Sequence, residues 1–258
     1  MDLRELKVVK GNAHRHPWEL ARLKVVTDLL IQASETTKNL KIVDIGCGDL
    51  FFLKELSYQF KESKLYAIDS AFTEQQVIDI NTTDEFGIKA YQDIKDCEAK
   101  NVSIVLLLDV VEHIKDDYAF LNYLNSSPLI GNNTLIAITV PAFQSLFCSH
   151  DRFLLHYRRY SNKTLSTLLK TTNFRTIKMG YFFFLLLIPR ILNVMIERVK
   201  RDDGEATGTG LSFWKGGRFV TTIIKSVLVM DFKFSYALGR IGCTLPGLSN
   251  FVICKKNV

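Results

Sequence analysis

Five short apolar runs alternate with helix-like segments between residues 41 and 141, and this alternation constrains the fold more than any other feature. The runs are KIVDIG, KLYAID, IKAYQD, VSIVLLLDV and NTLIAITVP. The fourth run is the most apolar, as is typical of a parallel strand buried on both faces. Strands that alternate with amphipathic helices indicate a parallel, doubly wound sheet. The sequence therefore predicts an α/β fold.

The last third of the chain is less regular. FRTIKMGYFFF and LPGLSNFVICKK are predicted to form two further strands. Between them lie two apolar helix candidates, YFFFLLLIPRILNVMIERVK and RFVTTIIKSVLVMDFKFSYAL, separated by the Gly-rich break RDDGEATGTG. We expect one domain with an N-terminal helical cap (1–40), a ligand-binding core (41–187), an apolar helical insertion (188–246) and a final strand (247–258). The Gly-rich break is expected to be the most mobile part of the insertion.

Charge is divided unevenly along the chain. Residues 1–151 carry 15 Lys+Arg against 22 Asp+Glu, whereas residues 152–258 carry 18 against 5. The basic part suits contact with phosphate groups or a membrane surface, or it is a solvated face without a partner. Neither apolar helix candidate offers the roughly 20 uninterrupted apolar residues of a bilayer span. The alternatives are a position on anionic lipid, a cover over a lipid-like acceptor, or closure of the core.

The five cysteines are scattered and form no C-x-x-C pair, which disfavours a disulfide framework or a zinc knuckle. No bound metal is predicted. The N-terminal stretch MDLRELKVVKGNAHRHPWEL lacks the apolar core of a secretory signal. A cytoplasmic location is expected, with peripheral contact to the inner face of the membrane as a further expectation.

The loop after the first strand reads Asp44-Ile45-Gly46-Cys47-Gly48-Asp49. Its two glycines permit a tight turn and the close approach of a ligand to the backbone. A dinucleotide fingerprint would place a third glycine where the chain has Phe51. The two aspartates also oppose a pyrophosphate. The loop favours a cationic ligand without phosphates, and a turn without any ligand is the alternative.

Three more acids, Asp69, Asp93 and Asp109, end the next three strands. A carboxylate after the second strand can accept hydrogen bonds from both hydroxyls of a ribose. Any one of these acids could simply cap a helix. Four acid-terminated strands in succession indicate one shared ligand site at the carboxyl edge of the sheet.

The segments VDIGCG, AID, YQDI and LLLDVVEHI, in this order, resemble the class I S-adenosylmethionine-dependent methyltransferases. The resemblance covers residues 12–178 and returns at LPGLSNFVICKK. It implies a Rossmann-like, seven-stranded, mostly parallel sheet with helices on both faces and an antiparallel final strand. Leu50 departs from it, because many members have glycine there, and this puts the shape of the cofactor loop in doubt. The resemblance implies these cofactor contacts: Asp44, Gly46, Cys47 and Gly48 around the methionine moiety, Asp69 and Ser70 at the ribose, Asp93 and Ile94 at the adenine, and Asp109 and Val110 beside the sulfonium.

Three segments, HRHPWELAR, VPAFQSLFCSHDRFLLHYRRYSNKTL and LPGLSN, also resemble a bacterial subgroup found among enzymes of envelope polysaccharide and lipid-linked sugar synthesis. Trp18 and Arg22 lie one turn apart on the first predicted helix. That helix is expected to cover the cofactor, with Arg22 near its carboxylate. The alternative is a core tryptophan beside a surface arginine.

Methyl transfer to a hydroxyl benefits from a base, and the loop after the fifth strand supplies candidates. His150 is the expected base, with Asp151 setting its tautomer or binding the acceptor, and His113 is the third catalytic candidate. Alternatively, this loop is tied to the sheet by His156 and Tyr160, an arginine pairs with Asp109 or Glu112, and His113 only packs. The expected acceptor contacts are His156, Arg158, Arg159 and Tyr160, with the two arginines on a phosphate or carboxylate of the acceptor.

The expected function is therefore methyl transfer from S-adenosyl-L-methionine to a small-molecule or lipid- or glycan-linked acceptor, at oxygen. One alternative is a catalytically silent methyltransferase-like module that binds a membrane or a partner. An NAD-type oxidoreductase is disfavoured by Phe51 and the acidic loop. A nucleic-acid partner is not expected, because the fourth strand runs into DVVEHI rather than into an N-P-P-Y or D-P-P-Y type motif.

Overall fold

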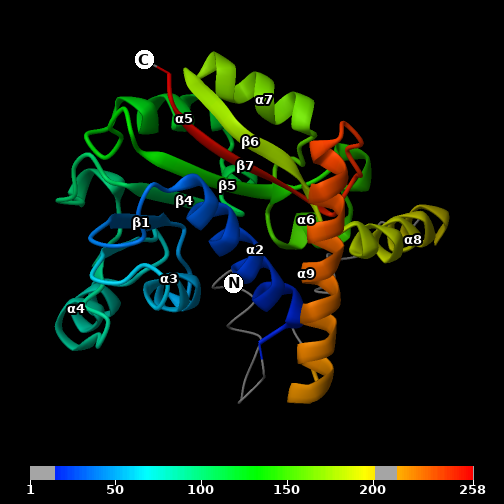
Figure 1. Cartoon of the computed structure of the whole chain (residues 1–258), viewed down its shortest axis with the longest axis horizontal. Coiled ribbons are helices and arrows are strands. Elements are labelled where there is room, and N and C mark those ends of the chain that lie inside the picture. Colours follow the sequence, from blue (N-terminus) through cyan, green and yellow to red (C-terminus); the bar gives the residue numbers. More distant parts are fainter. Residues whose placement is uncertain (1–14, 201–213, 258) are drawn as a thin grey trace.

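A computed structural model describes residues 15–200 and 214–257 (Figure 1). Most of the segment in which no secretory signal is expected, and the Gly-rich break, lie outside the described residues. One seven-stranded sheet has the order β3-β2-β1-β4-β5-β7-β6. Its strands are β1 (Lys41–Ile45), β2 (Lys64–Ile68), β3 (Lys89–Tyr91), β4 (Ile104–Leu108), β5 (Leu135–Pro141), β6 (Phe174–Phe182) and β7 (Ser249–Lys256).

The strand pairing confirms the expected Rossmann-like sheet. β1 pairs in parallel with β2 and β4, β2 with β3, and β4 with β5. β7 lies between β5 and β6 and is antiparallel to both. The chain runs from β1 outward to β3 and then returns to place β4 on the other side of β1. The strand order therefore reverses between β1 and β4, the place where open α/β sheets bind ligands.

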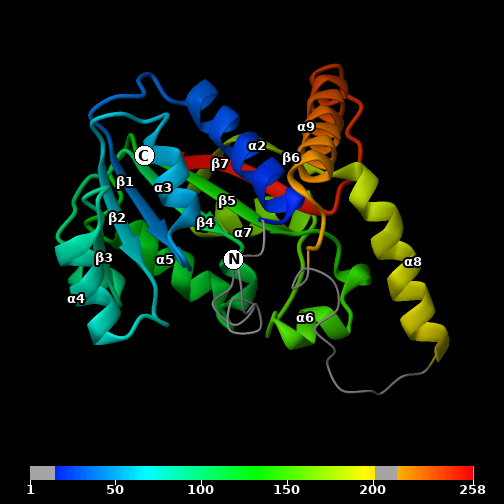
Figure 2. The ribbon, with the colours of Figure 1, turned by 90° about the horizontal axis from the view of Figure 1, so that it is seen from below.

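Helices cover both faces of the sheet (Figure 2). Ile42 and Leu106 point to one face, and the neighbouring Val43 and Val105 point to the other, as the two-residue period of strands requires. Each face thus has its own core. The first face is covered by α2 (Pro17–Ala33), α3 (Phe51–Ser57) and α9 (Arg218–Arg240), the second by α5 (Asp117–Ser126) and α7 (Asn162–Thr171), and α4 (Glu74–Thr83) packs beside β3.

Helix α2 confirms the first helix predicted from the sequence. Pro17 occupies its first turn, where a missing N–H costs nothing, and the His16 side chain accepts a hydrogen bond from the Trp18 N–H at 3.1 Å. Ala21, Val25 and other residues of one stripe are buried against the sheet and α9. The first turns of α2 reach the carboxyl edge of the sheet.

The apolar segment begins as helix α8 (Phe184–Lys200), directly after β6 rather than at residue 188. α8 extends away from the sheet in both views (Figures 1 and 2). Its buried side chains Leu187 and Val194 pack on Leu146 and Cys148, whereas α9 inserts Leu228 and Phe232 into the main core. Within the described residues, no helix combines the length and apolar character needed to cross a bilayer.

Candidate active site

The loop between β1 and α3 contains two glycines with a left-handed backbone, Gly46 and Gly48. Gly46 has φ +73°, a conformation that L side chains rarely adopt. A Cβ atom added to Gly46 would lie 2.7 Å from Cγ2 of Val110, which follows β4. Gly46 therefore lets the loop approach the neighbouring strand end closely.

Leu50, the position that departs from the resemblance, keeps a glycine-like backbone. Its φ is +64° and it precedes the first residue of α3. Its side chain is 7% exposed and belongs to the core under α2 and α3. The loop therefore has the left-handed turn that a glycine would favour, while the leucine side chain points into the core.

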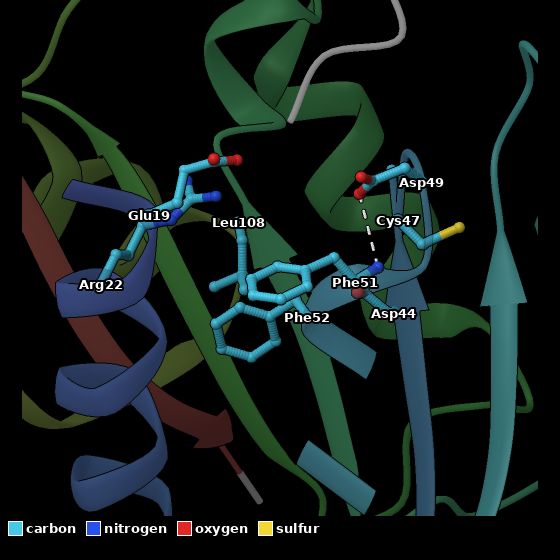
Figure 3. Close-up of a pocket in the computed structure, with 9 residues that line it drawn as sticks. Glu19, Arg22, Asp44, Cys47, Asp49, Phe51, Phe52 and Leu108 are labelled. Carbon is cyan, nitrogen blue, oxygen red and sulfur yellow. Dashed lines mark hydrogen bonds between the residues drawn. The ribbon is translucent and has the colours of Figure 1, made fainter. Parts of the chain in front are cut away.

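A small cavity lies between α2 and this loop (Figure 3). Glu19 and Arg22 extend from α2 on one side, and the rings of Phe51 and Phe52 lie between them and the loop. The cavity volume is about 20 Å³, enough for about one water molecule. Its lining consists of Glu19, Arg22, Asp44, Gly46, Cys47, Asp49, Phe51, Phe52 and Leu108.

Arginines of the α2 segment pair with the acids at the strand ends. Arg22 forms an ion pair with Asp109, and Arg15 pairs with Asp49. The Arg22 guanidinium also lies 4.5 Å from the centre of the Trp18 ring, and Asp109 accepts a hydrogen bond from the Thr139 hydroxyl at 2.9 Å. Arg22, which was expected to lie near the cofactor carboxylate, thus has a carboxylate of the protein, that of Asp109, as its partner in this structure.

Asp44 is the most deeply buried acid of the cavity, with 2% of its surface exposed. Burial raises its pKa to about 7, an effect strengthened by the charges of Asp69 and Asp49 and opposed by that of Arg22. Asp44 is therefore balanced between its neutral and ionised forms near neutral pH. A cation brought into the cavity would favour the ionised form.

The other predicted cofactor acids have local partners. Asp69 accepts hydrogen bonds from the backbone N–H groups of Gly48 and Ala71, both at 2.9 Å, so it fixes the loop that follows β1. Asp93 accepts from the Lys95 N–H at 3.0 Å and caps the 3₁₀ turn η1 (Ile94–Asp96), and this bond lowers its pKa. Ser70 is exposed beside Asp69. The structure brings Asp44 and Asp69 to the loop after β1, places Asp109 at the end of β4 against Arg22 of α2, and leaves Asp93 as an exposed cap.

Asp151 is the centre of a buried polar cluster in the loop after β5. It lies on the short helix α6 (Ser149–Phe153) and is fully buried. Burial alone would raise its pKa, but hydrogen bonds from His156 and Arg159 and the charge of Arg190 hold the pKa of Asp151 well below its usual range. Its oxygens accept from His156 Nδ1 at 2.9 Å, Arg159 Nε at 2.8 Å, Arg190 Nη2 at 2.8 Å and the Cys148 N–H at 3.0 Å.

This cluster corrects the expected pairing of His150 with Asp151, because the histidine that Asp151 holds is His156. His150 Nδ1 is buried and has no hydrogen-bond partner among the described residues. Burial, followed by the nearby charge of Arg190, lowers the pKa of His150 to about 4. His150 is therefore neutral at pH 7 and weakly basic.

Arg158, Arg159 and Tyr160, which were predicted to contact the acceptor, form ion pairs and hydrogen bonds with other residues of the protein. Arg158 pairs with Asp117 at 2.7 Å, and the Tyr160 hydroxyl donates to the same carboxylate at 2.6 Å. Arg159 donates to Asp151 and to the Ala142 carbonyl. These contacts tie the loop to α5 and to the sheet, the alternative that the sequence had left open, so both guanidinium groups already have carboxylate partners.

Sequence reasoning missed several residues of the site. Arg15, which precedes α2, forms an i, i+4 ion pair with Glu19 in the first turn of that helix, a spacing visible in the sequence. Arg190 lies within the segment that the sequence predicts as an apolar helix, and no local pattern connects it with Asp151. Glu112, in the 3₁₀ turn η2 (Val111–His113), is 0% exposed, and burial together with the Asp109 charge raises its pKa.

Comparison with known proteins finds similarity in structure alone. No family model matches the sequence, and no curated protein does. A structure of phosphoethanolamine N-methyltransferase 2 from Haemonchus contortus with S-adenosyl-L-methionine is similar with a TM-score of 0.52 and 16% identity, over 91% of this chain and 53% of that one. The mycolic acid cyclopropane synthase CmaA1 with S-adenosylhomocysteine gives a TM-score of 0.50 and 12% identity, over 90% and 83%.

A third structure, a proposed sarcosine dimethylglycine methyltransferase from Galdieria sulphuraria, is similar with a TM-score of 0.52 and 15% identity, over 93% of this chain and 84% of that one. The similarity extends over most of the described sheet and its covering helices. The fold of this chain is that of the class I S-adenosylmethionine-dependent methyltransferases.

Proposed function

We propose that this chain transfers the methyl group of S-adenosylmethionine to a hydroxyl oxygen of a small-molecule or lipid-linked acceptor. The observation that supports this most is the acid-lined cavity beside Gly46, located where the strand order reverses between β1 and β4. A place among enzymes of envelope glycan or lipid-linked sugar synthesis rests on the sequence segments that resemble that subgroup.

The residues of the cavity fit the charges of the cofactor. S-adenosylmethionine carries a sulfonium, an ammonium and a carboxylate. Asp44 in the cavity and Asp109, the partner of Arg22 beside it, would face its cations, and Arg22 would bind its carboxylate. Because the cavity has room for about one water molecule, binding requires Arg22 to leave Asp109. Arg22 thus exchanges one carboxylate for another, which limits the electrostatic cost of opening the site.

The chemical step asks little of the protein beyond placement and exclusion of water, since the sulfonium is an activated donor. His156, held by Asp151, would accept the proton of the acceptor hydroxyl. His150 is neutral at pH 7 and would orient the acceptor rather than deprotonate it. Arg190, which comes from α8, would keep the Asp151 carboxylate in place.

Cofactor affinity is expected to depend on pH through Asp44. As pH rises through about 7, Asp44 ionises and binds a cation better, so affinity should increase about tenfold between pH 6 and pH 8. Calorimetric titrations of wild type and Asp44→Asn at each pH measure this. The variant corrects for ionisation of the cofactor amine, and equal slopes for the two proteins would contradict the role of Asp44. In the free protein the raised pKa works in the opposite sense, and the contribution of Asp44 to stability falls as pH rises towards 7.

Asp69→Ala is expected to weaken binding of S-adenosylmethionine by about 10- to 100-fold, the worth of hydrogen bonds from the ribose hydroxyls to a charged group. The matched control is Asp79→Ala, because Asp79 is an exposed acid on α4. Calorimetric titration of both variants measures the difference. Equal affinities of the two would remove Asp69 from the cofactor site.

The acceptor is found by supplying cofactor with a labelled methyl group to extracts of the source cell and separating lipid, glycan, protein and nucleic-acid fractions. Label in the lipid or glycan fraction supports the proposed acceptor class. Label in protein or nucleic acid would overturn it. Absence of cofactor binding at millimolar concentration would favour the catalytically silent module instead.

A membrane surface is the second partner that we propose, because α8 and α9 both expose apolar side chains beside basic ones. The charged residues of α9 include Arg218, Lys225, Lys233 and Arg240 against the single acid Asp231. This composition suits anionic lipid. The exposed apolar residues are Leu185, Ile188, Ile191, Leu192, Met195, Ile196 and Val199 of α8, and Phe219, Val220, Ile223, Val227, Met230 and Phe234 of α9.

Co-sedimentation with vesicles tests this surface. Wild type is expected to bind phosphatidylglycerol vesicles and to bind phosphatidylcholine vesicles weakly. Ile196→Asp combined with Leu192→Asp should abolish binding, whereas Ile78→Asp, at a residue of similar exposure on α4, should not (54% for Ile78, 52% for Ile196). Binding that survives the α8 change, or that Ile78→Asp removes equally, would contradict the proposal.

A further inference from the structure

A second group of potential ligands lies next to the proposed methyl-transfer site. Glu112 and His113 follow β4 in the turn η2, and His156 comes from the loop after β5. One donor atom from each of the three residues lies within 4.8 Å of the other two. We propose that Glu112, His113 and His156 bind one divalent first-row transition metal ion. The sequence predicted no metal, because no local spacing joins DVVEHI to the histidine of HYRRY.

The carboxylate of Glu112 provides the first independent support. The residue is 0% exposed, and neither of its carboxylate oxygens has a hydrogen-bond partner among the described residues. Burying a carboxylate without partners is costly, so nearly all such groups in proteins are bonded or coordinate a metal. Asp109 lies close enough to add a like charge. A cation bound to Glu112 would satisfy both oxygens and offset that repulsion.

His156 is oriented as a ligand. Its Nδ1 is 2.9 Å from Asp151 Oδ1, so Nε2 is the nitrogen left to bind a metal. A carboxylate on the far nitrogen fixes the tautomer and the ring direction, as it does for most metal-binding histidines. Asp151 is itself held by Arg159 and Arg190. The His113 ring contacts the His156 ring edge to face, with centroids 4.6 Å apart.

The donor set selects the class of metal. Two imidazoles and one carboxylate suit zinc, iron, cobalt, nickel or copper, whereas magnesium and calcium prefer oxygen donors alone. In a tetrahedral zinc site the donors lie about 3.4 Å from one another, given bonds of about 2.1 Å. Side chains within 4.8 Å reach that spacing with small rotations. The side chain of His156 is 8% exposed and His113 is half-buried, so an ion held by them would lie just beneath the surface.

With an ion bound, His156 would be a ligand and not the base proposed above. The ion would bind an acceptor hydroxyl and lower its pKa, so that the hydroxyl proton passes to water and the alkoxide oxygen receives the methyl group. Only this role rests on the proposed function. Metal binding itself needs no S-adenosylmethionine, so a failure of the methyltransferase proposal leaves the metal site testable by itself.

The test uses the full chain stripped of metal with a chelator. Zinc is titrated calorimetrically, and cobalt(II) is titrated while visible absorption is followed. One ion per chain with a cobalt spectrum typical of four or five ligands is expected. Glu112→Gln, His113→Gln and His156→Gln should each lower zinc affinity at least tenfold, by analogy with the loss seen when groups around a metal are removed.

His150→Gln is the matched control, since His150 is a neighbouring histidine outside the three-residue group. Circular dichroism and thermal unfolding show which variants are folded. His113 is half-buried, so its variant keeps the test valid if the change at buried Glu112 prevents folding. Wild type without stoichiometric binding, folded variants with unchanged affinity, or an equal loss in His150→Gln would each overturn the site.

Discussion

Replacing Asp151 with alanine is expected to lower the free energy of unfolding by about 3–5 kcal/mol, the cost of breaking a buried ion pair by removing one partner. Asp151 is fully buried, and Arg159 and Arg190 both point charged nitrogens at it at 2.8 Å. Without the carboxylate these guanidinium groups are left close together in the interior. Urea denaturation of wild type and variant measures the difference.

The matched control for Asp151 is Glu98→Ala. Glu98 pairs with Lys89, but both side chains are 55% exposed. An exposed pair contributes about 0–1 kcal/mol. A loss below 1 kcal/mol in Asp151→Ala would mean that the cluster is not a structural centre. Because the pKa of Asp151 is depressed in the folded protein, its contribution is full at neutral pH and is lost only as pH falls below the ordinary aspartate range.

Gly46→Ala is expected to cost about 2–5 kcal/mol of stability and to remove binding of S-adenosylmethionine. The left-handed backbone costs an L residue about 1–2 kcal/mol. The new methyl group also meets Val110 at 2.7 Å, and overpacking of this kind costs about 1–3 kcal/mol. Thermal or urea unfolding measures stability, and calorimetry measures binding.

Gly87→Ala separates the two contributions. Gly87 also has a positive φ, +64°, but an added Cβ would have nothing within 4 Å. It should therefore lose only about 1–2 kcal/mol and leave cofactor binding unchanged. If Gly46→Ala behaves like Gly87→Ala in both measurements, the loop does not have to approach Val110 closely.

The strands of the sheet were predictable because each one is specified by a short apolar run of consecutive residues. A run such as VSIVLLLDV specifies a strand buried on both faces whatever its neighbours are, and β4 is the result. Helix α2 was likewise read from apolar spacing, and its predicted start differs by one residue from the observed Pro17. The helix predicted over residues 181–200 begins at Phe184, because the first two residues of that run end strand β6, and such a short apolar run suits a strand as well as a helix.

The site was less predictable because its contacts are distant in sequence. Glycines and acids at strand ends identified the loop after β1, whose position follows from fold class. Asp93 proved to be a cap of η1, which a strand-end acid alone cannot reveal. One partner of Asp151 is Arg190, which is 39 residues away in the sequence. It lies on a helix whose direction no local pattern specifies, so the sequence alone could not predict this contact.

The position of β7 dictates an order of assembly. Among the residues that the structure describes, β6 pairs only with β7, and β7 also pairs with β5. During synthesis, strands β1 to β5 can therefore pair with one another as each leaves the ribosome. Strand β6 has no strand to pair with until residues 249–256 have been made. The waiting strand exposes its backbone edge, so this interval is when a nascent chain is most prone to aggregate. A ribosome stalled with β7 still in the exit tunnel should leave the Thr176 amide open to hydrogen exchange, while amides of β4 are already protected.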